Sequence, residues 1–151
     1  MISQTAEYAL RAVAALASHP AEPMVTQRLA ELTRVPAGYL SKVLQALGRA
    51  GLVRSTRGLH GGFVLVRKAE ELSVYDVVQA VDPLQRIRTC PLGLAAHGVR
   101  LCPLHRRLDN ALAMVEDAFG STTLAEVLAE PTKSVPLCPF PAVRSKPRMA
   151  R

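Results

Sequence analysis

Two cysteines and two histidines, close together in the second half of the chain, could bind a metal. Cys90 and Cys102 enclose a glycine-containing loop, each is followed by proline, His97 lies inside the loop, and His105 comes three residues after Cys102. Thiolate and imidazole are ligands of zinc sites and of iron–sulfur clusters. A thiol at a helix start is also favoured as thiolate by the helix dipole. The spacing therefore predicts a metal site, with unrelated thiols and histidines as the alternative.

The same residues make a poor enzyme site. Cys102 and His105 could form a thiol–base pair, but the sequence near them offers no orienting third group and no oxyanion-type glycine motif. We therefore expect no enzymatic activity. The third cysteine, Cys138, lies in Leu-Cys-Pro-Phe within a proline-rich stretch, and we expect it not to be a ligand.

Residues 26–66 have the element order of a winged helix-turn-helix. A helical segment at 26–33 is followed by a break at Val35-Pro36 and a second helical segment at 37–49. In such a unit the second helix enters the DNA major groove with its N-terminal residues. This stretch therefore predicts a DNA-reading head.

A glycine-rich segment, 57–62, joins two short apolar runs at 52–56 and 63–66. This pattern predicts a β-hairpin wing, whose glycines allow a tight tip close to a phosphate backbone and whose Arg57 could reach the adjacent minor groove. A plain hairpin turn is the alternative for this tip. The candidate DNA contacts on helices and wing are Thr26, Gln27, Arg28, Gly38, Tyr39, Ser41, Lys42, Arg57, Gly58, His60, Gly61 and Gly62.

Charge is concentrated where the reading head is expected. The chain has a net charge of +7, and from Met24 to Lys68 it carries eight Lys or Arg against the single acid Glu31. Residues 69–130 instead carry nine acids against five bases. A basic surface that coincides with the motif is what phosphate binding requires, whereas a merely solvated basic face would need no such coincidence.

Helical periodicity defines the elements that support this head. Residues 4–18 predict an amphipathic first helix beneath it, ended by the prolines of 19–23. We expect Thr26 to be the N-cap of the second helix, and Gly51 to be the left-handed residue that closes the third. The expected inward-facing residues of the second and third helices are Leu29, Ala30, Leu32, Leu40, Val43, Leu44 and Leu47.

Capping boxes predict two further helices, at Ser73-Val-Tyr-Asp76 and at Thr123-Leu-Ala-Glu126. Between them, Pro103 is suited to the first position of a long helix that ends at Gly120. The apolar stripe of that helix is longer than a small core needs, which predicts a dimerisation helix, with an ordinary core helix as the alternative. The stripe consists of Leu104, Leu108, Ala111, Leu112, Val115, Ala118 and Phe119.

The fold class predicted is mainly α with a β-hairpin wing, plus a long dimerisation helix. Residues 1–83 form the winged helix-turn-helix, 84–102 the sensor loop, 103–130 the dimerisation helix with a short terminal helix, and 131–151 a basic, disordered tail. At 151 residues the chain suffices for one cored domain with an appended element. We find no signal peptide and no run of about 18 apolar residues, and therefore expect a cytoplasmic protein with reduced thiols.

The chain resembles the IscR/NsrR family of bacterial winged-helix regulators over about residues 1–128. The matching motifs, in order, are Glu7-Tyr8-Ala9-Leu10-Arg11, Tyr39-Leu40, Gly51-Leu52-Val53, Arg57-Gly58 with Gly61-Gly62, Val77 with Ala80-Val81-Asp82, and the cysteine loop before a long helix. The resemblance implies a homodimer that binds a partly palindromic operator in double-stranded DNA. It also implies a 2Fe–2S or 4Fe–4S cluster that senses cluster supply, nitric oxide or redox state.

The cluster ligands implied by the resemblance are a mixed set. Cys90, Cys102 and His105 fall on the outer positions of the family's loop, whereas Ala96, with His97 beside it, stands where the family has its middle cysteine. Some relatives add an acidic ligand from the partner's first helix, and Glu7 holds that place. The resemblance thus favours a 2Fe–2S centre over 4Fe–4S, with ligands drawn from these residues. Zinc, or no metal, is the alternative.

Taken together, the sequence predicts a homodimeric DNA-binding repressor, gated by a metal or redox event at the Cys90–Cys102 loop. Cluster binding or loss would reorder the loop and change the spacing of the two reading heads. A regulator of the same fold controlled by a small ligand, zinc or a partner protein is the first alternative. A protein whose helix-turn-helix contacts another protein is the second, and steeply salt-dependent binding to duplex DNA would exclude it.

Overall fold

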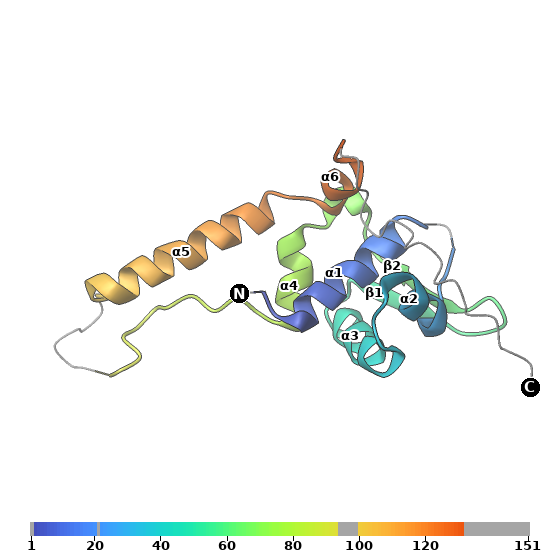
Figure 1. The fold of residues 1–151 in the computed structure, drawn as a ribbon, viewed down its shortest axis with the longest axis horizontal. Helices are drawn as coiled ribbons and strands as arrows, with labels where there is room; N and C mark the ends of the chain where they lie inside the picture. The colour runs from blue at the N-terminus through green and yellow to red at the C-terminus, as the bar shows by residue number, and fades with distance from the viewer. Residues whose placement is uncertain (1, 21, 94–99, 132–151) are drawn as a thin grey trace, which may run out of the picture.

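The computed structural model describes residues 2–20, 22–93 and 100–131, and it is mostly helical with one hairpin (Figure 1). The predicted fold class, mainly α with a β-hairpin wing, is therefore confirmed. The elements in order are α1 (Gln4–Ala17), α2 (Thr26–Thr33), α3 (Ala37–Arg49), β1 (Val53–Thr56), β2 (Gly62–Leu65), the 3-10 turn η1 (Ala69–Glu71), α4 (Val74–Val81), α5 (Pro103–Gly120) and α6 (Leu124–Ala129).

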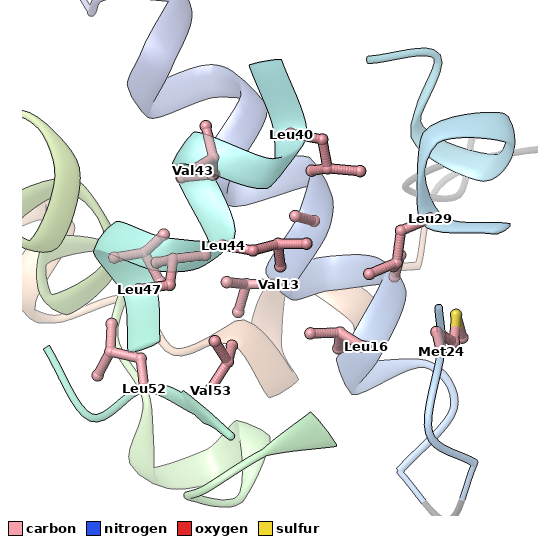
Figure 2. Close-up of a cluster of buried hydrophobic side chains, with 14 of the residues drawn as sticks. Val13, Leu16, Met24, Leu29, Leu40, Val43, Leu44, Leu47, Leu52 and Val53 are labelled. Carbon is pink, nitrogen blue, oxygen red and sulfur yellow. The ribbon is translucent and has the colours of Figure 1, made fainter. Parts of the chain in front are cut away.

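Helix α1 lies at the centre of the core, because its small and apolar residues let other helices approach closely. Val13 and Leu16 of α1 face the inward side of α3 in Figure 2, and both are buried. The α3 stripe matches the prediction in full. The other buried side chains labelled around it are Met24, Leu29, Leu52 and Val53.

The turn between α2 and α3 depends on a residue that the sequence analysis did not single out. Arg34 adopts a left-handed conformation with φ 57°, and Pro36 then precedes the first turn of α3. Two predictions for α2 are wrong. Val25, not Thr26, occupies the N-cap, so the helix starts without a side-chain cap, and Leu32 is 40% exposed rather than inward-facing. The buried Thr33 lies on that side instead, its hydroxyl donating to the Leu29 carbonyl at 2.6 Å.

Gly51 closes α3 as predicted. Its φ is 73°, its amide donates to the Gly48 carbonyl, and the Leu52 amide donates to the Leu47 carbonyl, both at 3.0 Å. These two bonds form a Schellman motif, which satisfies carbonyls that the end of a helix leaves unpaired. The motif turns the chain directly into β1.

A backbone bridge from the segment before α2 adds to the contacts that hold the wing on the core. Strands β1 and β2 pair antiparallel, with Val53 opposite Leu65 and Thr56 opposite Gly62. Met24 pairs with Phe63 as a further bridge, through N–H···O bonds of 3.0 and 2.8 Å. The segment before α2 therefore fixes the outer edge of the wing.

Both predicted capping boxes are present. The hydroxyl of Ser73 accepts from the Asp76 amide, and the hydroxyl of Thr123 accepts from the Glu126 amide. Burial opposes ionisation of Asp76, but hydrogen bonds from Ser73 and the neighbouring Arg67 lower its pKa below the ordinary value. Leu124 is buried in the main core and its amide donates to the Leu72 carbonyl. Helix α6 thus packs with the winged helix.

Helix α5 differs from all the others in having no buried residue. It extends away from the other helices in Figure 1, between the described segment 84–93 and α6. Leu104 is 65%, Leu108 48% and Met114 72% exposed. No helix among the described residues is long and apolar enough to span a membrane.

Candidate nucleic-acid interface and sensor site

Most of the candidate DNA contacts, at the starts of α2 and α3 and on the wing, are exposed. Gln27, Arg28, Gly38 and Lys42 are exposed, and Thr26 and Ser41 are half-buried. The wing residues Arg57, Gly58 and His60 are exposed as well. The four-residue turn at the wing tip is closed by the Gly61 amide donating to the Gly58 carbonyl at 2.9 Å.

Several of these side chains already have partners within the chain. Gln27 donates to Glu31 at 3.1 Å, Arg28 forms an ion pair with Glu22, and the Ser41 hydroxyl donates to the Ala37 carbonyl at 3.0 Å. Tyr39 is 37% exposed, and its hydroxyl lies 2.6 Å from the Thr5 hydroxyl of α1. These contacts limit the rotamers available to the side chains on this surface.

Gly61 and Gly62 are required by packing inside the wing. A Cβ atom at Gly61 would lie 2.4 Å from the Thr56 carbonyl oxygen. One at Gly62, where φ is 153°, would lie 2.6 to 2.8 Å from three backbone atoms of Met24. Such distances are shorter than a carbon atom tolerates, so both positions need glycine irrespective of DNA.

We call Cys90, Cys102 and His105 the candidate sensor residues, and they come together at the start of α5. His105 lies in the first turn, and its Nδ1 is 3.3 Å from Cys102 Sγ and 4.0 Å from Cys90 Sγ. The two cysteines are half-buried and are not joined in a disulfide. The predicted convergence of two thiols and one imidazole is therefore present in this chain.

This donor set fits a group that takes sulfur and imidazole ligands, but it does not complete one. Among residues 2–20, 22–93 and 100–131, no group of three or more His, Cys, Asp or Glu side chains meets metal-site geometry. His97, Ala96 and Cys138 lie outside the described residues. Glu7 lies on α1, where it forms an ion pair with Arg11. A metal bound by Cys90, Cys102 and His105 would need a further ligand.

An ion-pair cluster next to the sensor residues links the preceding segment to α5. We define the Arg86 cluster as Arg86, Asp109 and Glu116. Arg86 donates to both oxygens of Asp109 at 2.6 and 2.7 Å and to Glu116 at 3.0 Å. The Ile87 amide also donates to Asp109 at 2.9 Å, and the Tyr75 hydroxyl of α4 donates to Glu116 at 3.3 Å.

The electrostatics of the cluster favour the charged forms of Arg86 and Asp109. Hydrogen bonds to Asp109 and then to Glu116 raise the pKa of Arg86, and the hydrogen bonds from Arg86 lower the pKa of Asp109. Burial and the charge of Glu116 raise the pKa of Tyr75, which therefore stays a neutral donor. Asp109 lies four residues after His105, on the same side of α5. His105, Asp109 and Glu116 thus share one face of that helix.

Sequence reasoning missed this cluster and the contacts that α1 makes with α3. Arg86 lies 23 residues from Asp109 and 30 from Glu116, and nothing local marks such a pairing. The only available signal was the placement of His105, Asp109, Leu112 and Glu116 at helical spacing, which makes a mixed polar stripe beside the apolar one.

Comparisons with known proteins agree with this fold. The model of the Rrf2 family, described as an iron-dependent transcriptional regulator, matches residues 2–130. An HTH-type transcriptional regulator of Mycobacterium tuberculosis is 34% identical over 128 residues, covering 83% of this chain and 80% of that protein. The structure of Staphylococcus aureus CymR has a TM-score of 0.67 at 28% identity, covering 87% of this chain and 100% of that one. IscR of T. potens shares the fold, with a TM-score of 0.70 at 24% identity over 85% of each chain.

Proposed function

Because the chain belongs to the Rrf2 family of transcriptional regulators, we propose that it is a homodimeric repressor controlled at Cys90, Cys102 and His105. It is a DNA-binding regulator and not an enzyme. The observation that carries the control proposal is the approach of both thiols to one imidazole nitrogen at the start of α5.

The control group we propose is an iron–sulfur cluster, 2Fe–2S in preference to 4Fe–4S. Cys90, Cys102 and His105 would hold it, with the additional ligand from His97 or from Glu7 of a second chain. Such a group, when bound, supplies a centre whose charge depends on its oxidation state. Imidazole and carboxylate ligands in place of thiolates would raise its potential and couple it to protonation.

The positions of Cys90 and His105 in the fold explain how the bound group would control DNA binding. Cys90 ends the segment that the Arg86 cluster holds against α5, and His105 begins α5 itself. A metal group bound to both Cys90 and His105 would fix the direction of α5 relative to the helix-turn-helix. Loss of that group would let the direction of α5 vary. In a dimer, that direction sets the distance between two reading heads, which must match half-sites about 34 Å apart.

The dimer proposal rests on the unburied apolar face of α5. Leu104, Leu108 and Val115 lie on one side of the helix and are exposed. Beside them, Ile2, Leu84, Leu112 and Phe119 contribute to an apolar groove of about 360 Å³. A second copy of α5 is the occupant that we propose, because burying this much apolar surface favours association.

Replacing Leu108 with lysine should convert the dimer to a monomer. Burying a charge in an apolar interface costs several kcal/mol, which is on the order of a thousandfold in association. Sedimentation velocity of the wild type should give twice the mass of one chain, and that of the variant a single mass. Leu92→Lys, which changes an exposed leucine outside α5, should remain dimeric. A wild-type monomer at micromolar concentration, or a dimeric Leu108→Lys variant, would refute the α5 interface.

Anaerobically purified protein should contain iron and sulfide in equal amounts, and removing them should change DNA affinity. Affinity should be measured by fluorescence anisotropy on a duplex recovered by in vitro selection. We expect a change of roughly 5- to 150-fold between loaded and metal-free protein, the usual range of coupling between sites. Cys102→Ser and His105→Ala should lose the metal and bind DNA as the metal-free wild type does.

His19→Ala is the matched control, since His19 is bonded to a carbonyl at the end of α1 and should leave metal and affinity unchanged. Zinc without sulfide would replace the cluster proposal with a zinc site. Equal DNA affinity of loaded and metal-free protein would refute the control proposal but leave the DNA-binding regulator standing.

A further inference from the structure

Helix α1 makes a set of polar contacts with the start of α3. The Tyr39 hydroxyl shares a 2.6 Å hydrogen bond with the Thr5 hydroxyl. The rings of Tyr8 and Tyr39 meet edge to face, with centroids 5.3 Å apart and an angle of 86° between their planes. Gln4 in turn donates to the Tyr8 hydroxyl at 2.9 Å. Tyr39 is therefore held from two sides by residues of α1.

Arg11 makes the corresponding contact at the end of α2. Its Nη1 donates to the Thr33 carbonyl at 3.3 Å, its guanidinium lies 5.7 Å from the centre of the Tyr8 ring, and its other nitrogen pairs with Glu7. Thr33 immediately precedes the left-handed Arg34. Arg11 thus contacts the end of α2, before the turn, whereas Thr5 and Tyr8 contact the start of α3, after the turn.

We propose that Thr5, Tyr8 and Arg11 are positioning residues that set the first turn of α3 and thereby determine how well the protein distinguishes its operator from other DNA. This inference rests on the proposed use of α3 as the recognition helix. Two of these contacts, Thr5–Tyr39 and Arg11–Glu7, are solvent-exposed pairs. Their main effect is on the orientation of side chains rather than on stability, since exposed polar pairs stabilise a fold little.

The physical basis is that contacts with base edges tolerate smaller displacements of the protein than contacts with phosphates do. Contacts with base edges specify sequence, whereas phosphate contacts only position the protein. A small rotation of the first turn of α3 would displace Gly38 and Tyr39 relative to base edges. The flexible side chains that neutralise phosphates would still reach them. Loss of positioning should therefore reduce specific binding and spare non-specific binding.

Two substitutions that preserve shape or charge test this. Thr5→Val removes the hydroxyl that hydrogen-bonds to Tyr39. Arg11→Lys keeps the positive charge, but lysine has a single nitrogen and cannot replace the two guanidinium nitrogens that separately contact Thr33 and Glu7. Each should lower affinity for the selected duplex roughly tenfold. Affinity for a scrambled duplex, the salt dependence and the unfolding temperature should stay at wild-type values. Thr5→Ser, which keeps the hydroxyl, should restore wild-type discrimination.

Lys42→Gln is the comparison that separates this inference from the proposed function. It should reduce affinity for both duplexes and lower the salt slope by about one. If Lys42→Gln changed nothing, α3 would not be the recognition helix. If it behaved as expected while Thr5→Val and Arg11→Lys kept full discrimination, the positioning role would be wrong. Equal losses on both duplexes together with a lower unfolding temperature would also overturn it, as would tighter operator binding by Thr5→Val.

Discussion

Gly62→Ala is expected to detach the wing and abolish specific DNA binding. The new Cβ would lie 2.6 Å from a backbone carbon of Met24, at a φ of 153° that side chains rarely adopt. Met24 cannot move away while it keeps both of its backbone bonds to Phe63, at 3.0 and 2.8 Å. Breaking this bridge and straining the backbone should destabilise the fold by about 2–4 kcal/mol.

The measurements are urea unfolding and anisotropy on the selected duplex. Gly120→Ala is the matched control, because a Cβ there meets nothing within 4 Å and helical alanine is favoured over glycine. It should retain both stability and affinity. Wild-type stability and affinity in Gly62→Ala would mean that the wing does not depend on the Met24 bridge. A stable variant that had lost only DNA affinity would instead point to a direct contact of Gly62 with the phosphate backbone.

Much of the fold could be predicted because the relevant signals are local. Ser73 with Asp76, and Thr123 with Glu126, each lie three residues apart and satisfy helix ends within a single turn. Gly51 is likewise dictated by the helix end it closes. The α3 stripe follows from spacing alone. Features of this kind need no knowledge of what lies across the molecule.

The features that could not be predicted depend on distant partners or on backbone geometry without a residue signature. Arg34 takes a left-handed conformation that sequence would assign to glycine or asparagine. Thr26 has the chemistry of an N-cap, yet the chain enters α2 one residue earlier. Met24 became part of the wing through pairing with Phe63, 39 positions along the chain. No local pattern marks that pairing.

The candidate sensor site divides in the same way. Cys102 and His105 are brought together by the first turn of α5 and are predictable from spacing, and Cys90 joins them. The Arg86 cluster is not predictable, because it requires segment 84–89 to run back along α5. The proposed metal ligand set therefore came from sequence, whereas the proposed connection from that site to the rest of the molecule came only from structure.

Arg86→Met is expected to separate metal binding from DNA binding. Arg86 is the residue that holds the segment before Cys90 against α5, through two bonds to Asp109 and one to Glu116. Methionine of similar length would leave two carboxylates without their cation and release the segment. The sensor residues could then still bind metal, but the direction of α5 would no longer depend on whether metal is bound.

The expected result is a normal iron and sulfide content with a DNA affinity that no longer responds to it. The ratio of loaded to metal-free affinity should fall below about twofold, against the roughly 5- to 150-fold expected of coupled sites. Asp109→Asn, which weakens the same pairing from the other side, should behave in the same way. Arg107→Met is the control, since it removes an exposed cation of α5 that lies outside the cluster.

An Arg86→Met protein that kept the full wild-type ratio would show that the cluster does not carry the coupling. The sensor loop would then have to act on the second chain directly, without passing through α5 of its own chain. If the variant lost both the metal and the difference in DNA affinity between loaded and metal-free protein, Arg86 would instead be needed to form the sensor site itself. The Arg86 cluster is supported as the link between the two sites only if the variant keeps its metal and binds DNA equally well with and without it. In that outcome the metal site and the DNA-binding surface each still work, but one no longer affects the other.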